Sequence, residues 1–219
     1  MSYGLSFSND DGYVILDSEI ARMCVVAKGQ LANDGSSNNG STNYFPRAII
    51  SQEPPLIFVR PDAAAALMDV RVIGSPGYWT GFYIISRRGN GFSPGKWFAC
   101  TFGAQSVATY GLRLWDENEK LIFDSDTPAA VFTQSANSWI YTDTTKDSQG
   151  IYTNYYSASG YVDYGDYLMI NNISMNLVPD RRLVCSWNPQ VKSVTALTQS
   201  SNNPFSFSLS AFFAKMVAN

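Results

Sequence analysis

The stretch YGLSFSNDDGYVILDS, residues 3–18, decides the expected fold. In its first arm the residues Tyr3, Leu5 and Phe7 alternate with glycine or serine, which is the pattern of a half-buried strand. The polar run at 9–12 ends in glycine and tolerates a tight reversal, after which an extended apolar pattern resumes. Residues 3–18 therefore predict a β-hairpin.

The same hairpin recurs near the middle of the chain as YGLRLWDENEKLIFDS, residues 110–125. An ungapped alignment of the two stretches gives six identities in sixteen positions, namely Tyr3/Tyr110, Gly4/Gly111, Leu5/Leu112, Ile15/Ile122, Asp17/Asp124 and Ser18/Ser125. We interpret the match as an internal duplication that divides the chain into an N-terminal half, 1–108, and a C-terminal half, 109–219. A hairpin design that arose twice without common origin is the alternative.

The composition predicts an all-β protein made of two related antiparallel β-sandwich-like halves with little helix. Aromatic residues make up 14% of the chain, and glycine or Asn-Asp turns recur at short intervals. One or two helical turns are expected at Asp62–Met68, with Asp62 as the N-cap. Residues 32–43 are polar or glycine except for Ala32 and predict an exposed loop. Further strands are expected at 55–61, 70–72, 78–85, 96–102, 139–141, 151–156, 167–173, 182–187 and 205–213.

Charge and hydropathy exclude several classes of partner. Only 15% of the residues are charged and the net charge is −3, so the clustered Lys and Arg that bind nucleic acid are missing. No apolar run approaches the length that spans a bilayer, and Met1–Leu5 lack the features of a signal peptide. We expect a protein that is made and folded in the cytoplasm, without a membrane span.

The chain contains no histidine, which removes Ser-His-Asp and Cys-His catalysis and histidine-ligated zinc. Three cysteines stand far apart in apolar stretches and indicate buried free thiols: Cys24, Cys100 and Cys185. Acidic pairs at Asp10/Asp11, Asp124/Asp126 and Asp163/Asp166 leave carboxylate-pair hydrolysis open, although structural use of these residues is favoured. A calcium site at Asp124 and Asp126 is a weak alternative, since no EF-hand loop is present. We therefore expect no enzyme, no metal and no cofactor.

The stretch from 141 to 167 concentrates tyrosine among serine, threonine, asparagine and glycine. Tyrosine combines a flat apolar face with a hydroxyl, and so it stacks on sugar rings and anchors protein interfaces. The candidate contact residues are Tyr155, Tyr156, Tyr161 and Tyr164. The alternative is that most of the tyrosines in this stretch pack in the core.

The two hairpin strings resemble a hairpin of minor tail and tail-fibre proteins of tailed bacteriophages, and the proline-framed segment 55–61 is similar to the same group. The resemblance covers these short segments alone. The second copy departs from the pattern because Glu119 stands where the first has Gly12. No catalytic residue is implied.

The resemblance implies a non-enzymatic structural and adhesive component of a tail tip or tail fibre, located in the virion after synthesis in the host cytoplasm. Its partners would be other tail proteins, further copies of itself, and a host-surface glycan or protein. A stand-alone carbohydrate-binding module and a tailspike-like glycosidase are the alternatives.

Overall fold

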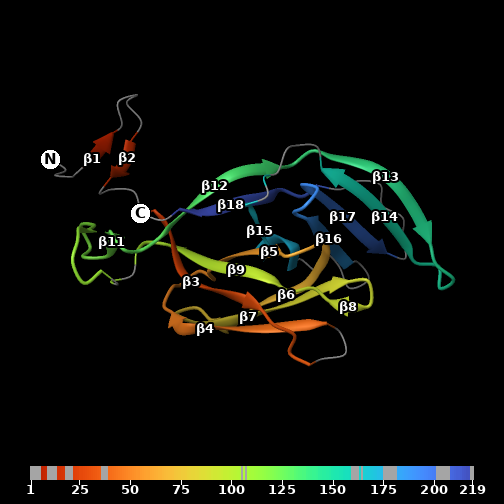
Figure 1. Cartoon of the computed structure of the whole chain (residues 1–219), viewed down its shortest axis with the longest axis horizontal. Helices are drawn as coiled ribbons and strands as arrows, with labels where there is room; N and C mark the ends of the chain where they lie inside the picture. The colour runs from red at the N-terminus through yellow and green to blue at the C-terminus, as the bar shows by residue number, and fades with distance from the viewer. Residues whose placement is uncertain are drawn as a thin grey trace.

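The computed structural model describes residues 6–8, 14–17, 22–35, 39–104, 106, 108–158, 163, 165–174, 182–200 and 208–217. The predicted all-β class is confirmed, because the described chain consists of antiparallel strands and one short 3-10 turn, η1 (Asn171–Ser174). The strands form a closed barrel, one large sheet and two separate hairpins (Figure 1).

The barrel has six strands in the order β12-β18-β15-β5-β9-β3. These strands span, in the same order, Ala129–Ala136, Ala211–Val217, Tyr167–Met169, Leu56–Pro61, Gly95–Phe102 and Met23–Leu31. Closure comes from the pairing of β12 with β3, where Ala129 lies opposite Cys24.

The large sheet has the order β13-β14-β17-β16-β6-β7-β4, with the short β8 (Gly91–Phe92) also paired to β7. The seven strands span Trp139–Lys146, Tyr152–Ala158, Ser193–Ser200, Arg182–Asn188, Ala65–Ser75, Tyr78–Arg88 and Gly40–Ile49. Its two edges are therefore β13 and β4, which Figure 1 shows at opposite sides of the molecule.

One large buried cluster joins the barrel to the sheet, and a second lies among the barrel strands. One contains residues of both, including Trp97 and Phe213 from the barrel and Phe82 and Trp187 from the sheet. The other draws side chains from all six barrel strands, with the Phe98 ring 4.9 Å from the ring of Phe58. Successive residues of a strand point to opposite faces, so each barrel strand can contribute to both clusters.

Strands from both sides of the expected division at residue 108 are interleaved in the barrel and in the sheet. The barrel pairs β5 with β15, and the sheet pairs β6 with β16. The strand order is nonetheless symmetric. In the barrel, β3, β5 and β9 occupy places equivalent to those of β12, β15 and β18. In the sheet, β4, β7 and β6 occupy places equivalent to those of β14, β17 and β16. Among the described strands of the sheet, β13 is thus the one long strand without a counterpart.

The two YGL hairpins have the same register. In the first, β1 (Ser6–Ser8) pairs with β2 (Val14–Asp17), and Ser6, Phe7 and Ser8 lie opposite Asp17, Leu16 and Val14. In the second, β10 (Arg113–Trp115) pairs with β11 (Leu121–Asp124) through the positions that the sequence alignment makes equivalent, including the irregularity before the third pair. The match in sequence is thus also a match in backbone pairing.

The helical turns expected at Asp62–Met68 are not present. Ala65 begins β6, in which Ala65 and Leu67 are buried on either side of the partly exposed Ala66, and these residues pair with β16. Alanine favours helices only weakly, and burial between two neighbouring strands outweighs that preference. The expected loop is likewise shorter than 32–43, because β4 begins at Gly40 and its Ser41 side chain is buried.

All three cysteines are buried free thiols, as expected. Burial raises the pKa of the Cys185 thiol to about 12 and raises that of Cys100 further. The thiolate is the reactive form, so neither thiol should react in the folded protein. We expect iodoacetamide at pH 8 to leave Cys100 and Cys185 unmodified in the native protein and to modify both in denaturant, as measured by peptide mass spectrometry. Native labelling of Cys185 at the denatured rate would contradict this packing.

Candidate functional site

The tyrosine ribbon, which we define as β13 and β14, forms one margin of the large sheet (Figure 1). β13 pairs only with β14 in the described part of the chain, and most of its residues are exposed on both faces. An edge strand presents backbone N–H and C=O groups that another strand can bind. The outer strand of the ribbon, β13, has no equivalent among the strands that the structure describes in the first half of the chain.

One face of the ribbon carries a connected set of hydroxyl, amide and aromatic groups. The Tyr141 hydroxyl lies 2.6 Å from the Thr144 hydroxyl oxygen, and this oxygen lies 2.5 Å from Oδ1 of the buried Asn154. The ring of Tyr141 meets that of its cross-strand partner Tyr156 edge to face at 5.9 Å. These contacts hold Tyr141 in place although its side chain is 45% exposed.

The sequence-predicted contact residues occupy different environments. Tyr155 is half-buried on β14, with its hydroxyl 3.4 Å from that of Thr145, and so it remains accessible. Tyr156 is only 2% exposed and packs inside the protein, as the alternative of core packing predicts for most of these tyrosines. Burial raises the pKa of its hydroxyl. Tyr161 and Tyr164 lie outside the described residues.

Two exposed residues of the ribbon were not singled out from the sequence: Ile140 and Tyr141. Trp139-Ile140-Tyr141 was recognised as a strand, but the sequence does not reveal that this strand forms an edge. Edge position depends on which strands pair, and those pairings join residues far apart in the chain. The signal that was available is the run of threonines after Tyr141, because a strand with polar residues at successive positions has no fully buried face.

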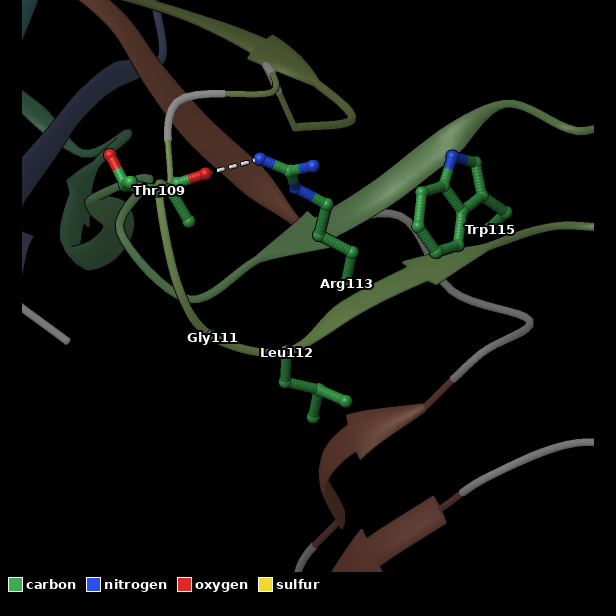
Figure 2. A pocket seen from close by; sticks show the side chains of 6 residues that line it. Thr109, Gly111, Leu112, Arg113 and Trp115 are labelled. Atoms are coloured by element: carbon green, nitrogen blue, oxygen red, sulfur yellow. Dashed lines mark hydrogen bonds between the residues drawn. The ribbon is translucent and has the colours of Figure 1, made fainter.

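The second hairpin is held by the buried carboxylate of Asp124. It accepts hydrogen bonds from the Ala108 and Asp126 backbone N–H groups, and its Oδ2 lies 2.9 Å from Nε of Arg113. The Arg113 guanidinium also donates to the Ala108 carbonyl oxygen, the dashed line in Figure 2. Asp124 thus has the backbone-binding role expected of a hairpin-end aspartate.

A shallow pocket of about 380 Å³ lies beside this hairpin, lined by Ala108, Thr109, Gly111, Leu112, Arg113 and Trp115 (Figure 2). Among the described residues of the lining, Arg113 alone is charged, and it is paired with Asp124. Tyr110, next to the pocket, is 90% exposed.

Of the other two acidic pairs, Asp10 and Asp11 lie outside the described residues, whereas Asp163 and Asp166 contact a lysine. The Lys215 ammonium lies 2.5 Å from Asp163 Oδ2 and 3.8 Å from Asp166 Oδ1, and the hydrogen bond to Asp163 is the main cause of the raised pKa of Lys215. Asp166 also accepts from the hydroxyl of Thr133. These contacts tie Asp163 and Asp166 to β12 and β18, a structural use of the carboxylates.

Within the described ranges, no group of three or more Cys, Asp or Glu side chains is placed to hold a metal ion. The same part of the chain has no helix that is long and apolar enough to cross a membrane. In comparisons with known proteins, no family model, no curated protein and no solved structure matches the chain. The case for function therefore rests on the residues themselves.

Proposed function

We propose that this protein is a non-enzymatic structural and adhesive component of a phage tail tip or tail fibre. It assembles with other tail proteins and with further copies of itself, and its tyrosine ribbon makes contacts that matter to this role. The two YGL hairpins support the phage assignment through their resemblance to tail proteins. The ribbon supports the contact role.

The observation that carries the contact role is the exposure of β13 at the edge of a sheet. Ile140 and Tyr141 offer apolar surface, while the threonines around them offer hydroxyl hydrogen bonds. Aromatic anchors at the centre of an interface typically supply most of its binding energy. A chain with few charges must obtain its affinity for a partner from such aromatic groups. The ribbon places them beside the edge of a sheet, where a strand of the partner can pair with β13.

A carbohydrate-binding module is the second candidate, and one observation favours it. The Tyr141 ring stands next to the hydroxyl of Thr144 and the amide of Asn154, which together present a stacking face beside polar groups. Sugar recognition uses this combination. In that case the ribbon would bind a glycan without any partner protein.

The mass of the native protein separates the candidates. The tail assignment predicts a defined oligomer by light scattering and co-purification with tail proteins of the phage that encodes it. A monomer that binds a purified glycan and ignores tail proteins would favour the carbohydrate-binding module. Release of reducing ends from a host polysaccharide would overturn the assignment to a non-enzyme.

Replacing Tyr141 and Tyr155 singly with alanine should weaken assembly or adhesion by about tenfold or more, because each substitution removes an accessible aromatic anchor. The free energy of unfolding should change by less than about 1 kcal/mol, since neither ring is fully buried. Equilibrium sedimentation and cell-binding assays measure the first effect, and urea denaturation measures the second.

The matched control is Tyr78→Ala, because Tyr78 is exposed on β7, away from the ribbon. This variant should assemble and bind normally. If both ribbon variants also assemble and adhere normally, the contact surface lies elsewhere.

A further inference from the structure

The pocket beside the second hairpin has an aromatic wall. Trp115, the last residue of β10, lines the pocket and is 53% exposed, and the neighbouring Tyr110 is far more exposed still. An aromatic side chain stabilises a fold when its faces are buried, so a tryptophan left half open contributes little to stability. The open face of the Trp115 ring is available to a ligand.

Arg113 supplies a polar wall on the same side of β10. Figure 2 shows the Arg113 guanidinium and the Trp115 indole on one side of the strand, while the Leu112 side chain points the other way. Alternate residues of a strand share a face, and two such residues lie roughly 6.5 Å apart along the strand. A single ring-shaped ligand can therefore contact both side chains.

The Arg113 guanidinium is held in place and still has donors to offer. Its Nε donates to Asp124 Oδ2 at 2.9 Å, and its Nη2 donates to the Ala108 carbonyl oxygen. These contacts use two of the five N–H groups of an arginine. Among the described residues no acceptor takes the other three, and the side chain is 33% exposed where it lines the pocket. The free donors are thus oriented before a ligand arrives, which lowers the entropy lost on binding.

The surroundings of Arg113 favour a neutral ligand. The buried carboxylate of Asp124 balances the charge of the guanidinium, so the pair has little net charge with which to attract an anion. The remaining N–H groups suit hydroxyl and ether oxygens, and the exposed Thr109 adds a hydroxyl to the lining. A pyranose ring matches both walls, because its C–H face stacks on an aromatic ring and its hydroxyl oxygens accept hydrogen bonds.

We propose that the pocket between Arg113 and Trp115 binds a neutral sugar residue of a glycan. The Trp115 ring stacks against the C–H face of the sugar, and the Arg113 guanidinium donates hydrogen bonds to its hydroxyl oxygens. This site is separate from the tyrosine ribbon. The inference does not rest on the phage assignment, which the mass and co-purification of the native protein test independently.

Titration with neutral oligosaccharides tests the site. The probes are oligosaccharides of glucose, galactose, mannose and N-acetylglucosamine, and binding is measured by calorimetry and saturation-transfer NMR. At least one probe should bind with a Kd of about 1 mM or below. Trp115→Ala should weaken this binding at least about tenfold, because the stacking face is lost. Trp115→Phe keeps an aromatic face and should weaken it less.

Two controls separate loss of the site from loss of the fold. The midpoint of urea unfolding should be nearly the same in Trp115→Ala as in the unmodified protein, since Trp115 is half exposed. Tyr141→Ala removes an exposed aromatic residue of the tyrosine ribbon and should leave the Kd for the sugar unchanged. Raising the salt concentration should also have little effect on binding, because no net charge is paired.

Each other outcome would overturn the inference. If none of the probes binds, the pocket is not a neutral sugar site. If Tyr141→Ala weakens binding and Trp115→Ala does not, the sugar lies on the ribbon. Binding of oligouronic acids alone, with strong salt dependence, would show that the pocket selects anions. Loss of co-purification with tail proteins in Trp115→Ala, without any sugar binding, would make the pocket a protein interface.

Discussion

Replacing Phe98 with alanine is expected to lower the free energy of unfolding by about 4 kcal/mol. The Phe98 ring is fully buried and lies 4.9 Å from the ring centres of both Phe58 and Tyr167. Phe58 belongs to the first half of the chain and Tyr167 to the second, so the loss should affect both halves together. Urea denaturation followed by fluorescence and circular dichroism should show one transition, shifted to a lower urea concentration than in the unmodified protein.

Phe102→Ala is the matched control, because Phe102 lies on the same strand but is 57% exposed. Its effect should stay below about 1 kcal/mol. If Phe98→Ala instead produces two separate transitions, with one half still folded, the interleaved barrel and sheet are not a single cooperative unit.

Replacing Asp124 with alanine is expected to destabilise the protein by about 3 kcal/mol. The substitution leaves the Ala108 N–H and the Arg113 Nε without their buried acceptor. Removing one partner of a fully buried ion pair typically lowers the free energy of unfolding by more than this. The Arg113 side chain is one-third exposed, however, so water can solvate part of the charge left without a partner. Thermal unfolding would show the loss.

The neighbouring Asp126 supplies the control, because its side chain is exposed. Asp126→Ala should change the free energy of unfolding by no more than about 0.5 kcal/mol. Equal losses in the two variants would mean that Asp124 is not the anchor of the second hairpin.

The elements that could be predicted from sequence are those built from local contacts. The hairpin at 110–125 is defined by its own alternation, and β10 pairs with β11 as the expected hairpin requires. Asp124 was expected to bind backbone amides at the hairpin end, which the structure confirms. The glycine of the repeated motif is also explained, because at Gly111 the backbone has a φ of 144° and an added Cβ would collide with the Ser125 hydroxyl oxygen.

The elements that could not be predicted depend on pairings between distant residues. The sequence repeat indicated two related halves but not that they share sheets, in which β6 pairs with β16 of the other half. The alanines at 63–66 favoured a helix only while that pairing was unknown. Prediction of the candidate site from sequence was limited in the same way. Tyr155 and Tyr156 differ in exposure because they point to opposite faces of β14.

Hydrogen exchange of the β13 backbone tests the central claim most directly. The amides of residues 139–146 should exchange measurably more slowly in the assembled or host-bound protein than in the free protein, while those near Tyr78 on the opposite side of the sheet should not change. Unchanged exchange across 139–146, with new protection elsewhere on the surface, would contradict the claim that the tyrosine ribbon is the contact surface.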